Sequence, residues 1–402
     1  MWTARASSQA VRPLRVTMLL ENNPYPQDVR VRAEARSLAR AGYRVRVIAP
    51  RANGEPPREM VDDVAVERYR LPLVHSGSSR RMLLEYVIAH AQLYWRGILA
   101  LARGADVIHA HNPPDTLFPL GLLGRAVGCK FVFDQHDVFP ELVTERYPNR
   151  MLATVARRAQ GMSVRAAHLV ITTNGSQRTA VLRRTARSQD DVIIVRNGLS
   201  SAWLQREVEH RRGALRDPRL VYVGLLEEQD GVDALPMILS MLVKRPGMEG
   251  ARLTVVGDGS RSHLLRAKVT ELGLDGQVHF TGLVSHDRAL AAIATADICL
   301  DVAPCTEFNH QTTMVKIIEY LTLGKPVVSF PLEETIALGG DAIAYATCND
   351  VGSFAARIAT LAESDSLRLE LIARARKLAG SLVWERSAEA LLKGYRMLEG
   401  EN

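Results

Sequence analysis

Three side chains in the second half of the chain have types and a spacing suited to a phosphorylated sugar. Thr312, Lys316 and Glu319 are separated by four and three residues, so on a helix they share one face. The start of a helix carries unpaired amides and a partial positive charge that suit phosphate. Lys316 would add a full charge, and Glu319 could accept hydrogen bonds from hydroxyl groups. The same spacing also fits a plain surface ion pair between Lys316 and Glu319.

The segment that carries these residues is predicted to be a helix with both ends marked. Thr312 and Thr313 offer side-chain oxygens that can cap unpaired amides at its start. Gly324 can adopt the left-handed conformation that ends a helix, and Pro326 prevents continuation. A helix over this segment would therefore place Lys316 one turn from its beginning and Glu319 a turn further along.

The chain has 402 residues, which is long for one hydrophobic core, so two domains are expected. Its formal net charge of +7 suits an anionic partner such as a nucleotide, a nucleic acid or an anionic membrane. The basic residues are scattered, without a long Lys/Arg run or a basic patch interleaved with aromatics, so we do not expect a nucleic-acid partner.

The four cysteines form no C-x-x-C pair, and we expect all four to be reduced thiols in a cytosolic protein. No cluster with the spacing of a metal site occurs, so no metal is expected. The sequence also has no apolar run of about 20 residues, and neither a membrane span nor a signal peptide is predicted.

Alternation of short apolar runs with helical segments predicts an α/β protein with parallel sheets. The strands are expected at residues 14–20, 43–49, 64–69, 107–111, 130–134, 169–173 and 192–195 in the first half, and at 219–224, within 253–259, 278–282, 297–301 and 327–330 in the second. Asn197-Gly198 is a predicted turn and domain boundary. The last helix, from about residue 386, follows the second sheet.

Several polar side chains follow strands of the first half, at the edge where open parallel sheets bind ligands. His111, and His136 with Asp137, lie just beyond two of these strands. Asn22 and Asp28 lie in the first loop and Arg30 begins the next helix, where a helix cap with a surface arginine is the simpler interpretation. The helix predicted over 79–103 carries an apolar stripe that fits packing on the sheet or contact with a membrane surface.

The order and spacing of several weak motifs resemble the glycosyltransferase family 4 type. The matching segments are Asp134-Gln135-His136-Asp137, Arg196-Asn197-Gly198, Tyr222-Val223-Gly224, Val255-Val256-Gly257-Asp258-Gly259, Phe280-Thr281-Gly282, and Glu319-Tyr320 through Gly324-Lys325-Pro326. The resemblance implies the GT-B fold, in which two Rossmann-like domains face a central cleft. The implied acceptor-side domain is 14–196, completed by the C-terminal helix 384–399, and the implied donor-side domain is 197–383.

The resemblance also implies roles for particular residues. Glu319 matches a glutamate that contacts the donor ribose, and His136 a histidine at the donor sugar and reacting centre. The other residues that we assign to donor binding are Gly224, Gly257, Gly259, Phe280, Gly282, Gln311, Thr312, Thr313, Met314 and Lys316. We assign Asn22, Asp28, Arg30, His111 and Asp137 to the acceptor side, and His136, Lys316 and Glu319 to the chemistry.

The chain departs from the family pattern at three positions. Gln311 stands where a glutamate is usual, Leu225 where an arginine is usual, and Asp230 where a lysine is usual. The two missing basic residues normally bind the diphosphate, and Lys316 could substitute for them. The patterns around Lys316 and Asp230 resemble a subgroup of bacterial cell-surface polysaccharide transferases.

We therefore predict a retaining glycosyltransferase that needs no metal or cofactor. It is expected to move a sugar from a nucleotide-sugar, which we expect to be a UDP-sugar, to a saccharide or lipid-linked saccharide. It is predicted to be cytoplasmic and peripheral on the anionic inner membrane. A nucleotide-sugar epimerase on the same fold and a non-catalytic nucleotide-sugar-binding scaffold are the alternatives.

Overall fold

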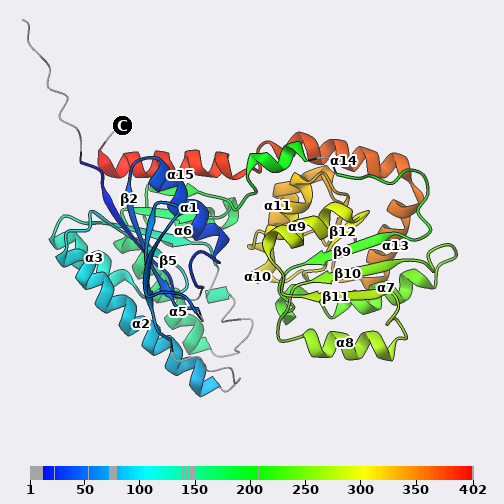
Figure 1. Cartoon of the computed structure of the whole chain (residues 1–402), viewed down its shortest axis with the longest axis horizontal. Helices are drawn as coiled ribbons and strands as arrows, with labels where there is room; N and C mark the ends of the chain where they lie inside the picture. Colours follow the sequence, from blue (N-terminus) through cyan, green and yellow to red (C-terminus); the bar gives the residue numbers. More distant parts are fainter. Residues whose placement is uncertain are drawn as a thin grey trace, which may run out of the picture. The chain divides into compact units, whose positions relative to one another are not determined.

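The computed structural model (Figure 1) describes residues 12–400 apart from 22, 53, 72–78, 138–139, 142–143, 145–149 and 207. The chain forms two compact units. Unit 1 comprises the residues up to 172, 178–195 and those from 388 onward, and unit 2 comprises 173–177 and 196–387. Among the described residues, none of the helices combines the length and hydropathy that a membrane crossing requires.

Unit 1 contains an eight-stranded sheet of order β3-β4-β2-β1-β5-β6-β7-β8, parallel except for the β3–β4 pair. Its strands are β1 (Arg15–Leu19), β2 (Arg44–Pro50), β3 (Arg58–Val61), β4 (Val64–Tyr69), β5 (Val107–His111), β6 (Lys130–Gln135), β7 (Leu169–Thr172) and β8 (Val192–Ile194). The helices are α1 (Val29–Arg40), α2 (Ser79–Ala102), α3 (Phe118–Ala126), α5 (Arg150–Ala166), α6 (Gly175–Arg184) and α15 (Trp384–Glu399).

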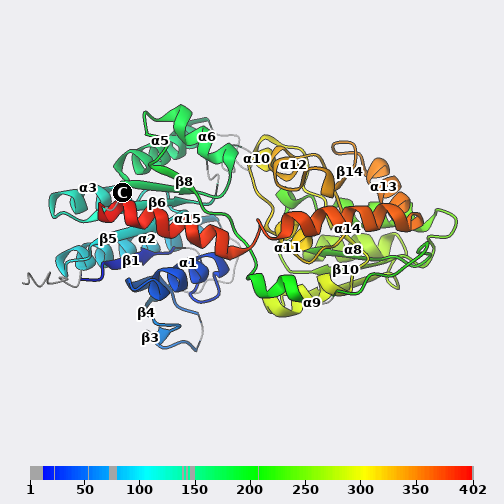
Figure 2. The same ribbon diagram turned by 90° about the horizontal axis from the view of Figure 1, so that it is seen from above.

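The helices of unit 1 cover both faces of its sheet. Crossovers between parallel strands are right-handed, so α1, which leads back along the strand order, lies on the face opposite to α2, α3 and α5. Figure 1 shows α2 and α5 on one side of the sheet and α1 and α15 on the other, and Figure 2 shows α15 lying over the sheet beside α1. In α15, Tyr395 stacks edge-on against Tyr43 with ring centroids 5.4 Å apart.

Unit 2 contains a six-stranded parallel sheet of order β11-β10-β9-β12-β13-β14. Its strands are β9 (Arg219–Val223), β10 (Arg252–Val256), β11 (Val278–Gly282), β12 (Ile298–Asp301), β13 (Val327–Ser329) and β14 (Ala344–Tyr345). The helices are α7 (Ala234–Val243), α8 (Ser262–Glu271), α9 (His286–Thr295), α10 (Glu307–His310), α11 (Val315–Thr322), α12 (Glu333–Gly339), α13 (Val351–Glu363) and α14 (Asp365–Ala379). Two buried apolar clusters line the two faces of this sheet.

The predicted strands are all present, and the α/β class with two parallel sheets is confirmed. Two short strands, β3 and β14, were not predicted. The turn into β4 uses Asp62 and Asp63, both with positive φ (52° and 64°), which suits a tight hairpin. Two consecutive aspartates are a weaker hairpin signal than Asn-Gly, so the sequence pattern does not reveal β3.

The prediction of four reduced cysteines is wrong for one pair. Cys305, in the loop after β12, forms a disulfide with Cys348, just before α13, whereas Cys129 and Cys299 are buried free thiols. The partners are 43 residues apart in sequence, and only the folded loops bring them together. The backbone amide of Cys305 also donates to the side chain of Asn349 at 2.8 Å, which ties the two loops at a second point.

Replacing both bridged cysteines with serine is expected to lower the free energy of unfolding by about 4 kcal/mol, the loop-entropy value for a cross-link of this span. Urea unfolding with and without a reductant measures the difference. Reductant should destabilise the wild type and leave the Cys305→Ser/Cys348→Ser variant unchanged. Equal stability of wild type and variant under oxidising conditions would contradict the expectation.

Candidate functional site

The helix expected to carry Thr312, Lys316 and Glu319 begins later than predicted. α11 starts at Val315, and the preceding residues Glu307–His310 form the separate helix α10. The Thr312 hydroxyl donates to the Phe308 carbonyl at 2.9 Å, and the Thr313 hydroxyl accepts from Asn174 at 3.0 Å. Neither threonine caps α11, so that prediction is wrong, and the shared helical face consists of Lys316 and Glu319 alone.

Lys316 lies buried beside the end of β9, with 7% of its side chain exposed. Its Nζ is 3.3 Å from Asp230 Oδ1 and 3.5 Å from Asp301 Oδ1, and it sits 4.9 Å from the centre of the Tyr222 ring. Burial alone would lower the pKa of Lys316, but the surrounding Tyr222, Asp301 and Asp230 outweigh it and raise the pKa. The ammonium is therefore fully charged, and a plain surface ion pair with Glu319 is excluded.

Glycines bring the backbone close to Lys316. Gly224, with φ of 151°, follows β9, and a Cβ there would lie 2.9 Å from the Lys316 Cε. A Cβ on Gly257, with φ of 132°, would overlap the Gly224 carbonyl oxygen, and one on Gly259 would lie 2.5 Å from the Leu226 carbonyl oxygen. Side chains at these positions would push apart the loops that follow β9 and β10 and displace Lys316.

Glu319 follows Lys316 on α11 and is also buried. Its carboxylate is in contact with a histidine. Its Oε1 lies 2.8 Å from Nε2 of His286, at the start of α9, and this hydrogen bond raises the pKa of His286. Sequence reasoning did not single out His286, because one histidine at a helix start carries no motif. Phe280 and Gly282 lie in β11, and the Arg266 guanidinium stacks over the Phe280 ring at 4.4 Å.

The turn before α11 is held by residues from a distant segment. The Asn174 amide donates to the Gln311 carbonyl and to the Thr313 hydroxyl, both at 3.0 Å, and the Ser176 amide donates to Glu334 at 2.9 Å. These contacts group residues 173–177 with unit 2. Gln311 is the C-cap residue that follows α10, and Met314 is the N-cap residue of α11, where its side chain makes no capping hydrogen bond. Nothing in the sequence pattern indicates the role of Asn174.

In unit 1, the predicted surface arginine is instead the centre of a buried polar cluster. Arg30 donates to both oxygens of Asp134, at 3.2 and 3.0 Å, and lies 3.0 Å from Glu34. It also donates to the Val195 carbonyl at 2.9 Å. Asp28 is the N-cap of α1 and accepts from the Val31 amide at 3.0 Å. Asn22 lies outside the described residues.

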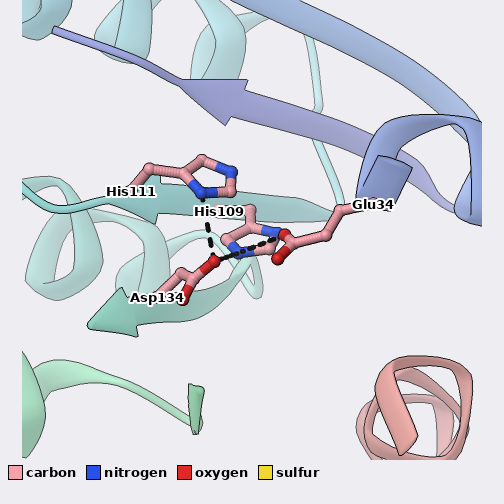
Figure 3. Close-up of side chains that lie close together, drawn as sticks. All are labelled: Glu34, His109, His111 and Asp134. Atoms are coloured by element: carbon pink, nitrogen blue, oxygen red, sulfur yellow. Dashed lines mark ion pairs between the residues drawn. The ribbon is translucent and has the colours of Figure 1, made fainter. Parts of the chain in front are cut away.

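Four side chains of this cluster converge in the way that metal ligands do (Figure 3): Glu34, His109, His111 and Asp134. Their ligand atoms all lie within 4.8 Å of one another. The Arg30 guanidinium supplies one positive charge beside the two carboxylates, while burial and the neighbouring Asp134 raise the pKa of Glu34 well above its usual range. With Glu34 protonated, the cluster is balanced by its own residues. His109 is fixed from the other side, because its Nδ1 lies 2.9 Å from the Tyr395 hydroxyl of α15.

The two histidines predicted for the site have different environments. His111 is 1% exposed, and burial lowers its pKa although Nδ1 is 3.2 Å from Asp134. His136 is more open, with 15% of its side chain exposed, and its Nδ1 lies 3.8 Å from Asp134. Burial alone would lower the pKa of His136, but Asp134 outweighs it and raises the pKa. His136 is therefore the ring available at the end of β6.

Asn112 fixes the backbone at His136. Its side-chain oxygen accepts from the amides of His136 and Asp137, at 2.7 and 3.0 Å. Its amide group donates to Asp115 at 3.0 Å and to the Asp137 carbonyl at 2.8 Å. Asn112 is fully buried, whereas the Asp137 side chain is exposed. The sequence places Asn112 next to a strand end but does not show that it bridges two strands.

Asp115 should make the stability of the protein depend on pH. Burial raises its pKa from 3.8 to about 7, so between these values the folded state holds a proton that the unfolded state has lost. The stabilisation of the folded state by this bound proton is complete below pH 4 and is lost as pH rises through 7. In the wild type, this titration should lower the free energy of unfolding by on the order of 3 kcal/mol between pH 5 and 8. Asp115→Asn should not show this decrease.

Urea unfolding of wild type, Asp115→Asn and the exposed control Asp63→Asn at pH 5 and pH 8 tests this. Glu21, whose pKa burial raises to about 7, should leave a smaller pH dependence in the variant. If Asp115→Asn and Asp63→Asn show the same pH dependence as the wild type, Asp115 does not hold the proton.

Two family models match the chain, one mainly in each unit. The model described as "Glycosyl transferase 4-like domain" matches residues 27–198, and the model described as "Glycosyl transferases group 1" matches residues 217–364. The chain belongs to the glycosyltransferase family 4 type. No curated protein matches the sequence of this glycosyltransferase.

Solved structures show the same fold along the whole length of the glycosyltransferase. Sucrose-phosphate synthase from Thermosynechococcus elongatus has a TM-score of 0.73 at 17% identity, with 97% of this chain and 100% of the other covered. HepE from Anabaena, in complex with UDP and glucose, has a TM-score of 0.68 at 17% identity, with 95% and 99% covered. WaaG, a glycosyltransferase involved in lipopolysaccharide biosynthesis, has a TM-score of 0.68 at 17% identity, with 96% and 100% covered. The predicted GT-B fold is confirmed.

Proposed function

We propose that this glycosyltransferase transfers a sugar from a UDP-sugar, with retention at the anomeric carbon, to a saccharide or lipid-linked saccharide of a bacterial surface polysaccharide. The observation that carries the proposal is the pair Lys316 and Glu319 on one face of α11. Lys316 packs against Gly224, and Gly257 packs against the backbone of Gly224. We prefer UDP as the nucleotide of the donor because the HepE structures contain UDP, glucose and UDP-glucose.

Lys316 takes the role of the basic residues missing at 225 and 230. Its ammonium projects to the end of β9, where Gly224 leaves room for it, and there it would attract the donor diphosphate. The amides of Thr313 and Met314, before α11, would add hydrogen bonds to the diphosphate and sugar. The Thr312 amide, which was expected to join them, instead donates to the Asn309 carbonyl at 3.1 Å. Glu319 would accept hydrogen bonds from the ribose hydroxyls in place of His286.

The proposed reaction needs no metal or cofactor of its own. The bond between the anomeric carbon and the diphosphate oxygen breaks, and the acceptor oxygen bonds to that carbon from the same face. The acceptor proton passes to a donor phosphate oxygen. The charge on the leaving diphosphate is stabilised by Lys316 and the preceding amides, as positioned dipoles and charges stabilise developing charge elsewhere.

His136 is proposed as a positioning group at the donor sugar. Asn112 fixes its backbone, and Asp134 favours its protonated form. The raised pKa favours an imidazole that donates hydrogen bonds to the sugar hydroxyls. Asn22, Asp28, Arg30, His111 and Asp137 remain predictions for the acceptor side, although the donors of Arg30 are directed to buried partners. We also propose a cytoplasmic location with peripheral contact to an anionic membrane.

Transfer to a lipid-linked oligosaccharide or a free oligosaccharide, with UDP-sugars as donors, tests the proposal. We expect UDP release that depends on acceptor and a product that keeps the anomeric configuration of the donor, measured by NMR. Turnover of donor to its epimer without acceptor would identify an epimerase. Binding of a nucleotide-sugar without turnover across a broad acceptor panel would favour the scaffold alternative, which Asp230 and Leu225 suggest.

A further inference from the structure

Helix α2 has two apolar faces. One face, with Ala89, Leu93 and Ala100, packs into the core of unit 1, as the sequence suggested. The opposite face consists of five exposed residues that follow one another at spacings of three or four: Leu84, Val87, Ala91, Trp95 and Ile98. The largest of them, Trp95, has 61% of its surface exposed. All five are apolar and four of them are large, which is unusual for the solvent side of a helix.

The neighbouring helices extend this apolar surface. Their exposed large apolar residues are Leu122 and Leu123 of α3, Val127 just after α3, and Met151, Leu152, Val155 and Met162 of α5. With the four from α2, these are 11 of the 21 exposed large hydrophobic residues described in the chain. Because the three helices make up a small part of the chain, this concentration is not the scatter expected of an ordinary soluble surface.

The three helices present their outer surfaces on one side of unit 1. All three connect strands in the same direction along the sheet, so right-handed crossovers place them on the same face. α3 lies between α2 and α5, and Leu120 of α3 fits against Gly97 of α2. We call the exposed residues of α2, α3 and α5 the basic–apolar face.

All the charged side chains that α3 and α5 contribute to this face are positive. These two helices carry five arginines, Arg125, Arg150, Arg157, Arg158 and Arg165, and no acidic residue. Among the described residues, none of the five forms an ion pair. Arg157, Arg158 and Arg165 also line a hollow of about 250 Å³ between α5 and α6, large enough for an anionic headgroup. Arg184 lines it too, but its guanidinium is already paired with Glu141 at 2.8 Å. Exposed apolar side chains mixed with arginines that lack a carboxylate partner fit a negatively charged lipid surface.

We propose that the basic–apolar face docks unit 1 on a bilayer of anionic lipids. Leu84, Trp95 and Met151 enter the boundary between headgroups and acyl chains, and the arginines of α5 meet lipid phosphates. A second copy of the chain fits less well, since a two-fold contact would set the arginines of α5 against one another. The proposal deepens the proposed function by naming the surface at which a lipid-linked acceptor would be met.

Sedimentation with vesicles tests the docking without donor or acceptor, so its result is independent of catalysis. We expect the full chain to bind vesicles of 30% phosphatidylglycerol in phosphatidylcholine at least tenfold more tightly than pure phosphatidylcholine. Binding should weaken on raising salt from 50 to 500 mM, since headgroup attraction is screened. Trp95 fluorescence should shift to the blue on binding, and Trp95→Phe should remove most of that shift.

Two variants separate the contributions of charge and apolar contact. Arg157→Glu/Arg158→Glu is expected to weaken binding to anionic vesicles by at least about tenfold, since each arginine contributes about 1 kcal/mol near such a surface. Met151→Ser/Val155→Ser should weaken binding at high salt as well. The matched controls lie in unit 2: Arg245→Glu/Arg252→Glu and Leu264→Ser/Leu283→Ser, all exposed. They should bind as the wild type does.

Three results would overturn the proposal. The first is the absence of vesicle binding by the wild type. The second is equal loss of binding in the unit 1 variants and the unit 2 controls. The third is a dimer, seen by light scattering, that Met151→Ser/Val155→Ser converts to monomer while vesicle binding is unchanged, which would assign the face to contact between copies.

Discussion

Replacing Lys316 with methionine is expected to raise the Kd for UDP by at least tenfold, about 1.4 kcal/mol, while replacing Asp230 with asparagine lowers it. Lys316 Nζ is shared between Asp230 and Asp301, at 3.3 and 3.5 Å, so its field at the diphosphate is partly offset by two carboxylates. Asp230→Asn removes one of them and leaves the ammonium. Opposite changes at two residues in contact are hard to explain by a general loss of structure.

Calorimetric titration of UDP at a temperature where every variant is folded measures the effect. Lys316→Met leaves the buried Asp301 and the half-buried Asp230 without a cation and should also unfold more easily. The double variant Lys316→Met/Asp230→Asn removes one charge of each sign, so it should regain stability but still bind UDP poorly. Wild-type affinity in Lys316→Met would contradict the diphosphate role.

Asp134→Asn is expected to cost about 3–5 kcal/mol of unfolding free energy, the range for breaking a buried ion pair. Arg30 directs two donors to Asp134 and is itself buried, so the change leaves the guanidinium with Glu34 as its remaining carboxylate. His111 and His136 would also lose the charge that favours their protonated forms.

Urea unfolding at pH 7 compares Asp134→Asn with Asp137→Asn, an aspartate of the same motif whose side chain is exposed. The control should lie within about 0.5 kcal/mol of the wild type, as surface changes usually do. Burial alone would raise the pKa of Asp134, but Arg30, His111 and His136 lower it well below its usual range. The stabilising charge is therefore present at neutral pH and is lost only in strong acid.

The sequence predicts the elements of this protein better than it predicts their ends and partners. Runs of β-branched and apolar residues place the strands, because burial in a parallel sheet needs them. The start of α11 was misplaced, since Thr312 and Thr313 could cap a helix but bind Phe308 and Asn174 instead. Helix ends depend on such long-range contacts, and one sequence does not contain them.

In the candidate site, too, the residues of local motifs could be predicted and those that act through distant partners could not. Lys316 and Glu319 were found from their spacing on a helix, and the glycines from the motif order. His286, Asn174 and Asn112 were not singled out, because each acts through a partner distant in sequence. Arg30 was read as a surface residue since nothing near it in sequence shows that Asp134, 104 residues later, meets it in the interior.

The measurement that tests the central claim most directly is a thermal-shift screen of UDP-, GDP-, ADP- and dTDP-sugars on wild type, Glu319→Ala and the exposed control Glu333→Ala. A ligand at 100 times its Kd should stabilise the folded state by about 2.7 kcal/mol. The account predicts a shift with the UDP-sugars that Glu333→Ala keeps and Glu319→Ala loses. No shift with any nucleotide-sugar, or an equal shift in Glu319→Ala, would contradict the placement of the donor at α11.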